Sequence, residues 1–325
     1  MNTSDYFSGK RVLVTGASGF IGSNLSKVLA NNEVEVHGVY LNAPESILNN
    51  IKIHWWKCDL EDIGATRNLI NNLKPDIIFH LAGWVMGSRS LEHVLPTFHS
   101  ILASNVNILT VATEVGCQRV IITGSQEEPE SGDPYVIPSS PYAAAKWGAS
   151  AYARMFHALY NTPVVNACVF MVYGPGQRDH KKLIPYTILS HFQNSIPIFT
   201  SGSRQVDWIY VEDVVDGLLA AARVPNIEGQ TIDIGSGETV LIKDIVYQLT
   251  TILKSKIQPE FSTVPDRPLE QTRIANISKT YSTIGWKPKT TLAQGLRQTA
   301  EWYKQNVGSL LMLYNFIFSN FIPQL

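Results

Sequence analysis

The chain has 325 residues, of which 45% are apolar and 16% charged, a composition that excludes a disordered protein. Lysine and arginine total 26 against 27 aspartate and glutamate, so no positive excess is available for binding nucleic acid. Three widely spaced cysteines, Cys58, Cys117 and Cys168, stand in apolar contexts and predict buried free thiols in a reducing compartment, the cytoplasm. The first residues lack a basic and an apolar run, so we expect no secretory signal.

A glycine-rich turn links the first predicted strand to the first predicted helix. Val12–Val14 is a short apolar run typical of a buried parallel strand, and a helical spacing of apolar residues begins at Phe20. Between and after them stand Gly16, Gly19 and Gly22, which would permit a tight turn and a close approach of backbone to phosphate. The start of a helix attracts anions, so the stretch predicts a pyrophosphate site. An ordinary tight turn is the alternative that this stretch alone leaves open.

Strands and helices then alternate, which predicts an α/β fold: a doubly wound parallel sheet with helices on both faces. A helical pattern runs from Pro96 to Val115 and stops at Gly116. His80 lies in an apolar strand pattern, and we expect a satisfied core histidine there. Further strand-like runs cover 34–40, 51–60 and 119–125, and the stretch 73–83 is typical of a loop, a strand and an exit of small residues. Ligands bind such sheets at the carboxyl ends of the strands.

The end of the second strand leaves the choice between NAD and NADP open. An acid at this point binds the ribose of NAD, whereas an arginine accommodates the phosphate of NADP. Tyr40-Leu-Asn42 contains neither, so we expect NAD or NADP, with a lean to NADP. Asp59, at the end of the third strand, is either a contact to the cofactor or the N-cap of the next helix.

Tyr142 and Lys146 are four residues apart at the start of an alanine-rich helix that follows Pro141, so they share one face. A phenol titrates near ~10, and lowering its pKa by ~3 units takes ~4 kcal/mol of differential stabilisation. A nearby ammonium and an oxidised nicotinamide would both favour the phenolate, and Ser125 would bind the same substrate oxygen. An ordinary exposed i,i+4 pair is the alternative.

Together these motifs resemble the extended short-chain dehydrogenase/reductase superfamily, and more closely its nucleotide-sugar epimerase/dehydratase branch. The likeness rests on Thr15–Gly22, Asp59-Leu60, His80–Gly83, Ser125 and Tyr142-x-x-x-Lys146, and it extends from Lys10 to Asn306. It implies an NAD(P)-binding Rossmann domain over 1–170 and a smaller α/β nucleotide-sugar-binding domain over 171–307, some strands of which return to the Rossmann sheet. An apolar tail follows over 308–325.

The resemblance also implies roles for individual residues. Tyr142 would be the acid/base, Lys146 would bind the nicotinamide ribose and lower the Tyr142 pKa, and Ser125 would orient the sugar hydroxyl or ketone. The other cofactor contacts would be Gly16, Ser18, Gly19, Phe20, Ile21, Gly22, Asp59, Leu60, Leu81, Ala82 and Gly83. The sugar nucleotide would contact Ser125, Gln126, Met171, Arg204 and Arg267, the two arginines gripping the diphosphate.

The residues after Ser125 bear on the reaction. Dehydratases of this branch carry an acid pair there, whereas this chain has Gln126 and Glu127, so Glu127 is a single candidate acid. The pattern Gly124-Ser-x-Glu-Glu128 also resembles 4-keto-6-deoxyhexose reductases. We therefore predict a nucleotide-diphospho-sugar 4-ketoreductase, with a 4-epimerase or 4,6-dehydratase as the alternative and a non-catalytic sensor or scaffold as a more distant one. Cys168 and Met171 replace an arginine and an asparagine usual in the branch.

Two further expectations concern association. The resemblance implies a homodimer through two helices, one of them 142–160. The apolar stretch Leu310–Ile322 is shorter than the ~20 residues that span a bilayer, and we expect it to pack on protein, with membrane contact as the alternative.

Overall fold

We describe a computed structural model of the chain, covering residues 3–32, 34–42, 52–130 and 135–318. Within 307–318 the chain is described by its backbone, with the exposure of Gly308 in addition. The chain forms two compact units. The first consists of Met1–Val169, Val214–Ile234 and Asn276–Lys287, and the second of Phe170–Asp213, Gly235–Ala275 and Pro288–Leu325.

A seven-stranded sheet of parallel strands forms the centre of the first unit, in the order β3-β2-β1-β4-β5-β6-β9. The order reverses beside β1, as in doubly wound folds that bind a ligand at this point. The predicted α/β class is therefore confirmed. The strands are β1 (Arg11–Thr15), β2 (Glu35–Tyr40), β3 (His54–Lys57), β4 (Ile77–His80), β5 (Arg119–Ser125), β6 (Val164–Val169) and β9 (Thr231–Ile234).

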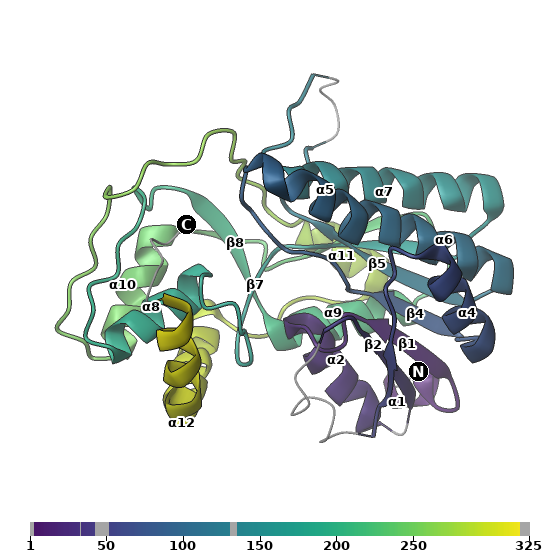
Figure 1. The fold of residues 1–325 in the computed structure, drawn as a ribbon, viewed down its shortest axis with the longest axis horizontal. Helices are drawn as coiled ribbons and strands as arrows, with labels where there is room; N and C mark the ends of the chain where they lie inside the picture. Colours follow the sequence, from purple (N-terminus) through teal and green to yellow (C-terminus); the bar gives the residue numbers. More distant parts are fainter. Residues whose placement is uncertain (1–2, 33, 43–51, 131–134, 319–325) are drawn as a thin grey trace. The chain divides into compact units, whose positions relative to one another are not determined.

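Helices cover both faces of this sheet because the central strands are apolar on both sides. Figure 1 shows α4, α6 and α7 on one side of the sheet, and α2 and α9 on the other. Phe7 of α1 also packs on the sheet, with its ring 6.4 Å from that of Phe79. The helices are α1 (Thr3–Phe7), α2 (Phe20–Ala30), α4 (Ile63–Leu73), α6 (Ser104–Val115), α7 (Pro141–Tyr160), α9 (Val211–Arg223) and α11 (Ile277–Ile284).

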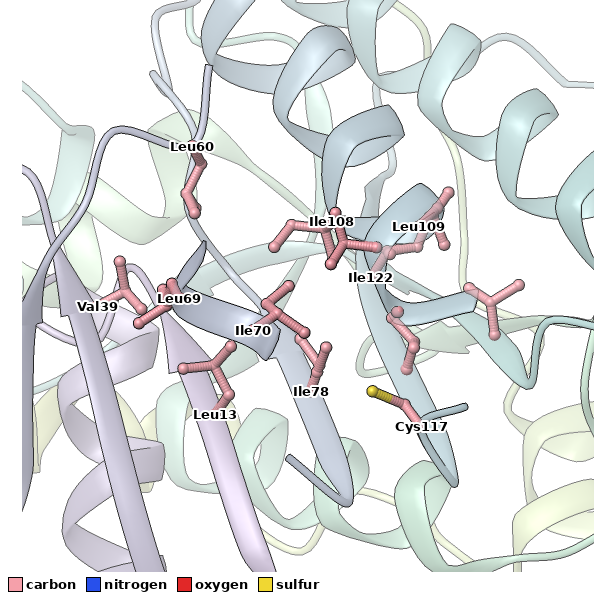
Figure 2. Packing of buried hydrophobic residues seen from close by; sticks show 14 of the residues in the cluster. Leu13, Val39, Leu60, Leu69, Ile70, Ile78, Ile108, Leu109, Cys117 and Ile122 are labelled. Carbon is pink, nitrogen blue, oxygen red and sulfur yellow. The ribbon is translucent and has the colours of Figure 1, made fainter. Parts of the chain in front are cut away.

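One core cluster lies between the sheet and the helices α4 and α6. Figure 2 shows Leu13 and Ile78 from neighbouring strands beside Leu69 and Ile70 of α4, together with Ile108 of α6. Each side chain of this size contributes about 1.5–3 kcal/mol when it is fully buried. Cys58 and Cys117 belong to the same cluster, and all three cysteines are buried and free, as predicted.

The helix predicted from Pro96 to Val115 is present, begins earlier, at Leu91, and changes its hydrogen-bonding pattern along its length. The structure has η1 (Leu91–His93), α5 (Val94–Thr97) and the π-helical turn η2 (Phe98–Ala103) before α6. A π-turn disturbs the regular backbone hydrogen bonding, and side chains compensate for it here. The Ser104 hydroxyl donates to the Ser100 carbonyl at 2.6 Å, and the Asn105 amide to Ile101 at 2.7 Å.

The run Leu91–Val115 is long and apolar enough to cross a membrane by length and composition alone. Its α6 part, however, supplies Ile108, Leu109 and Val111 to the core cluster. We therefore interpret the run as a core helix of the first unit.

The second unit contains a smaller sheet in the order β10-β8-β7, with β7 parallel and β10 antiparallel to β8. Its strands are β7 (Met171–Tyr173), β8 (Gln205–Tyr210) and β10 (Thr239–Leu241), and its helices α8 (Leu183–Phe192), α10 (Ile242–Ile252) and α12 (Leu292–Phe318). Trp208, Leu249 and Leu296 belong to its core. The predicted packing of Leu310–Ile322 concerns side chains outside the described part of the chain.

A buried carboxylate holds the loops of this unit together. Asp207 of β8 is fully buried and accepts hydrogen bonds from the backbone N–H groups of Ser236 at 2.7 Å, Gly237 at 3.0 Å and Ala275 at 3.0 Å. The Ser236 hydroxyl adds a further bond at 2.7 Å. Because these partners come from two separate loops, this single side chain fixes both of them.

Candidate active site

The glycine turn has the conformation that a dinucleotide requires. Gly16 has φ +63°, and a Cβ atom there would stand 2.8 Å from the backbone nitrogen of Ala82. A Cβ at Gly22 would overlap the carbonyl oxygen of Gly16. The N-cap residue of α2 is Gly19, which provides no side-chain cap, so the first N–H groups of the helix point at a space without a capping side chain. This cradle fits the pyrophosphate of a dinucleotide.

Thr15 and His80 tie this turn to the end of β4. The Thr15 hydroxyl oxygen accepts the backbone N–H groups of Leu81 and Ala82, each at 3.1 Å, so its own hydrogen is directed to His80 Nδ1 at 2.8 Å. The His80 proton must then be on Nε2, which faces the Ser104 hydroxyl at 3.4 Å. Burial, with the charge of Lys146 second, lowers the pKa of His80 to about 3. His80 is therefore a neutral core histidine, as predicted.

Ser125, Tyr142 and Lys146 are brought together by β5 and the first turns of α7. The helix begins after Ser140, whose hydroxyl accepts the N–H of Ala143 at 3.1 Å, with Pro141 in its first turn. The Ser125 hydroxyl hydrogen-bonds the Tyr142 hydroxyl. Lys146 Nζ lies 6.0 Å from the centre of the Tyr142 ring.

The Lys146 ammonium is buried and donates to two atoms of Thr123, the carbonyl at 2.7 Å and the hydroxyl at 3.2 Å. The pKa of Lys146 is lowered to about 8. Burial is the main cause, and the carboxylate of Glu128 partly offsets it by raising the pKa. Lys146 therefore stays mostly charged at neutral pH.

The pKa of Tyr142 is raised, first by burial and then by the carboxylate of Glu127, whereas the hydrogen bond from Ser125 lowers it. The phenol is therefore a proton donor at neutral pH. Its use as a base requires a further positive charge beside it, and an oxidised nicotinamide provides such a charge. The predicted lowering of this pKa by Lys146 stays a prediction, and the structure adds two carboxylates that oppose it.

A tight turn follows Ser125. The Ser125 hydroxyl oxygen accepts the N–H of Glu127 at 3.2 Å, and the Ser125 carbonyl accepts the N–H of Glu128 at 3.1 Å. Gln126 and Glu128 are buried, and Glu127 is half-buried. Glu128 entered the sequence prediction only as part of the reductase-like pattern, although the spacing Ser-x-x-Glu is that of a capping box and could have pointed to its bond with Ser125.

Asp59 and Leu60 occupy different surroundings. Asp59 is exposed, and its carboxylate accepts the N–H of Glu61 at 3.0 Å. The N-cap of α4 is instead Asp62, which accepts the N–H groups of Gly64 at 2.7 Å and Ala65 at 3.1 Å. The N-cap role considered for Asp59 is therefore wrong. Leu60 is 7% exposed and belongs to the core cluster (Figure 2).

The other predicted cofactor contacts lie at the carboxyl ends of β1 and β4. Gly19 and Gly83 are exposed, and the remaining positions are half-buried: Ser18, Phe20, Ile21, Leu81 and Ala82. Because the backbone of Leu81 and Ala82 lies against Gly16, the structure joins these two loops.

Three predicted substrate residues belong to the second unit. Met171 begins β7 and is half-buried, as is Arg267. Arg204 forms an ion pair with Glu270 at 3.1 Å and donates to the Gln271 carbonyl at 3.4 Å. A diphosphate at Arg204 would therefore share the guanidinium with the Glu270 carboxylate. The binding roles of these residues stay predictions.

Comparison with known proteins agrees with this geometry. The model of the NAD dependent epimerase/dehydratase family matches residues 12–235. The chain belongs to this family. It is 30% identical over 317 residues to a UDP-glucose 4-epimerase from Mycolicibacterium smegmatis, covering 90% of this chain and 98% of the relative. It is 28% identical over 340 residues to a dTDP-glucose 4,6-dehydratase from Haemophilus influenzae, covering 92% and 99%.

Solved structures of related proteins are also similar to this chain over nearly its whole length. An epimerase from Methanothermobacter thermautotrophicus has a TM-score of 0.84 at 25% identity, with 96% of this chain and 97% of that chain covered. UDP-glucuronic acid 4-epimerase from Bacillus cereus, in complex with UDP-glucuronic acid and NAD, has a TM-score of 0.80 at 25% identity and coverage of 91% and 99%.

The family determines the class of enzyme and of cofactor. The protein is an NAD-dependent nucleotide-sugar epimerase/dehydratase of the extended short-chain dehydrogenase/reductase type, which confirms the predicted resemblance. The predicted nicotinamide dinucleotide is confirmed as well, whereas the lean to NADP stays a prediction.

Proposed function

We propose that the protein is a 4-epimerase of nucleotide-diphospho-hexoses, with UDP-hexoses as its first candidates. The hydrogen bond between the Ser125 and Tyr142 hydroxyls supports hydride chemistry at the sugar C4, and the likeness to a UDP-glucose 4-epimerase carries the choice of epimerisation. Two hydroxyl groups that share one hydrogen bond can take a proton from a sugar hydroxyl and return it to the same oxygen, as an epimerase must. The relative that is 30% identical, a UDP-glucose 4-epimerase, supports the same reaction.

In this mechanism the sugar C4 hydroxyl lies against Tyr142 and Ser125. The bound nicotinamide supplies the acceptor, and later the donor, of the hydride at C4. Tyr142 holds the hydroxyl proton at its phenolic oxygen and returns it after the sugar has presented its other face. Ser125 directs its hydroxyl to the same oxygen, and the Lys146 ammonium binds the nicotinamide ribose. Gly16 and Gly22 leave room for the pyrophosphate.

Two observations favour the epimerase over the 4-ketoreductase predicted from the sequence. That prediction relied on the pattern Gly124-Ser-x-Glu-Glu128, but the Glu128 carboxylate is bonded to the backbone of its own turn. The pattern thus has a local structural use, and it loses its weight as a sign of reductase chemistry. The curated relatives named above are an epimerase and a dehydratase.

The test uses the purified full-length protein with UDP-glucose, UDP-galactose and UDP-glucuronate, without added NADH or NADPH. We expect the 4-epimer to accumulate to an equilibrium mixture, measured by chromatography, with no net change in nicotinamide absorbance. Tyr142→Phe should lower this rate by about 100-fold or more while binding of NADH persists. Stoichiometric oxidation of NADPH with nucleotide-linked 4-keto-6-deoxysugars, and no epimer, would instead establish the reductase.

A 4,6-dehydratase is the second candidate, because the Glu127 carboxylate lies close enough to Tyr142 to raise the pKa of the phenol. A carboxylate at this point could move the proton that dehydration removes from C5. The variant Glu127→Gln separates the two reactions. An epimerase should keep most of its turnover in this variant, whereas a dehydratase should lose about 100-fold or more.

We also infer a homodimer and a cytoplasmic location. Exposed apolar side chains on α5, η2 and α7 support a subunit contact: Leu95, Phe98, Trp147, Tyr152, Leu159 and Tyr160. The three free cysteines suit a reducing compartment. Light scattering coupled to size-exclusion chromatography measures the mass in solution and so tests the dimer. The double variant Leu95→Asp, Phe98→Asp should be a monomer. An unchanged mass in that double variant would contradict an interface at this surface.

A further inference from the structure

Glu128 is a buried carboxylate for which the proposed mechanism has no use. It is 7% exposed, and its Oε1 atom accepts the N–H of Ser125 at 2.7 Å. Its own N–H donates to the Ser125 carbonyl at 3.1 Å. The two residues are therefore bonded twice, backbone to backbone and side chain to backbone. This closes the turn that carries Gln126 and Glu127.

The carboxylate reaches this place because of Gly124. The position of a Cβ at Gly124 would lie 2.6 Å from Glu128 Oε1 and 2.8 Å from Asn166 Oδ1. Any side chain at residue 124 would therefore displace the carboxylate, the Asn166 amide or both. The carboxylate lies on the last residues of β5, beside the strand β6 that carries Asn166.

Asn166 supplies a second sign that the site is built for an anion. Its Nδ2 atom donates to the Ser150 hydroxyl at 2.9 Å and to the Thr231 hydroxyl at 3.4 Å, while Oδ1 has no hydrogen-bond partner among the described residues. Turning the amide by half a turn would direct its NH2 group toward Glu128 and let its oxygen accept from Ser150. The Asn166 oxygen would then have a donor, since a hydroxyl can donate as well as accept, and its NH2 group would lie at the Gly124 position that Glu128 Oε1 also borders.

The charge of Glu128 faces the reacting side chains. Its carboxylate raises the pKa of Lys146 against the larger effect of burial, and it also raises the pKa of Tyr142. Cys168 of β6 also raises the pKa of both groups, and Glu127 raises the pKa of Tyr142. His80 of β4 is the other titratable group that feels the charge of Lys146.

We propose that Glu128 is a positioning residue of the active site. Its carboxylate fixes the Ser125–Glu128 turn and places a negative charge at Gly124, next to Thr123, to which the Lys146 ammonium is hydrogen-bonded. The proposal rests on the roles proposed above for Ser125, Tyr142 and Lys146. It assigns two separable functions to one side chain, a hydrogen bond to Ser125 and a negative charge beside Lys146. A merely structural carboxylate would affect folding alone.

Two substitutions separate these functions. Glu128→Gln keeps an oxygen that can accept the Ser125 N–H but removes the charge. Glu128→Leu removes both and retains a side chain of similar bulk. Glu130→Gln removes the same charge from an exposed position two residues later and is the matched control. Thermal unfolding of every variant is recorded first, so that a misfolded protein is recognised.

The first readout is the affinity for NADH as a function of pH, measured by its fluorescence without any sugar. Affinity should fall as pH rises through the pKa of Lys146, because the ammonium binds the nicotinamide ribose. In Glu128→Gln this fall should begin at a lower pH, by about 1 unit, because the variant lacks the negative charge that raises the pKa of Lys146. Glu130→Gln should follow the wild type.

The second readout is hydrogen exchange of the Ser125 amide, followed in a peptide from the end of β5. In Glu128→Leu this amide should exchange about tenfold faster because it loses its acceptor, whereas in Glu128→Gln its exchange should stay close to wild type.

The third readout is the pH profile of turnover with a UDP-sugar. In Glu128→Gln this profile should shift to lower pH, because the pKa values of Lys146 and Tyr142 both fall.

Each outcome decides the proposal. A wild-type pH dependence of NADH affinity in Glu128→Gln overturns the charge role, and unchanged exchange in Glu128→Leu overturns the role in the turn. If the wild type converts no UDP-sugar, the proposed epimerase reaction fails. The NADH titration and the exchange measurement still decide the role of Glu128 in that case.

Discussion

The neutral state of His80 makes a quantitative prediction about stability. The native pKa of about 3 lies below the value of ~6.5 for an unfolded histidine, so between these values the unfolded chain binds a proton that the folded protein does not. Stability supported by this residue is present above pH ~6.5 and is lost as pH falls toward 3. Between pH 7 and pH 5 the loss amounts to about 2 kcal/mol of unfolding free energy.

The variant His80→Asn isolates this effect. Asparagine Oδ1 can accept the Thr15 hydroxyl in place of Nδ1, so the link to the glycine turn is preserved while the titration is removed. His37, His180 and His191, whose pKa values burial also lowers, contribute to both proteins alike. Urea unfolding at pH 7, 6 and 5 should therefore show that the variant loses about 2 kcal/mol less than the wild type.

Ser104→Ala is the control, because it removes the partner of Nε2 but leaves the imidazole in place. It should retain the pH dependence of the wild type. Equal pH dependence in wild type and His80→Asn would refute the reasoning, since His80 would then not be held neutral by burial. The denaturant slope must agree among the proteins at each pH for the comparison to hold.

Two further substitutions test the turn and the second unit. Gly22→Ala places a methyl group against the Gly16 carbonyl, so we expect a loss of NADH affinity of about 100-fold or more. Gly308→Ala, where no described atom lies within 4 Å of the new methyl group, should bind NADH normally, and equal affinities of the two variants would contradict the close packing. Asp207→Asn replaces one carboxylate oxygen by an NH2 group, so a backbone N–H that has an acceptor in the wild type faces a donor, and urea unfolding should show a loss of about 2–4 kcal/mol. A wild-type midpoint would show that the carboxylate does not hold these loops.

The sheet and the glycine turn were predictable because they depend on local patterns. Each central strand is a short apolar run. The turn after Val14 has no room for a side chain at Gly16 or Gly22, and the glycines themselves indicate this in the sequence. The Tyr142–Lys146 pair was visible for a similar reason, since four residues make about one helical turn. In each case the property that decides the structure lies within a few neighbouring residues.

Other features depend on contacts between a side chain and the backbone. The π-turn at Phe98–Ala103 is compensated by the Ser104 and Asn105 side chains, whereas apolar periodicity predicts only a plain helix there. Glu128 likewise acts through the backbone of Ser125, so the sequence suggested reductase chemistry where the structure has a turn. The pairing of Arg204 with Glu270 joins residues distant in the chain, and no local pattern announces it.

The first unit is assembled from three separate stretches of the chain, and this has a consequence for how the protein is made. Strand β6 is complete at Val169, but its outer neighbour β9 is supplied only by Thr231–Ile234. A growing polypeptide therefore carries an apolar, half-paired sheet edge while some sixty residues are still being synthesised, and such an edge invites aggregation. Because both units consist of several stretches of the chain, dividing the gene at one position cannot encode either unit as a complete fragment. Expression of this enzyme in fragments should consequently fail unless both pieces are produced together.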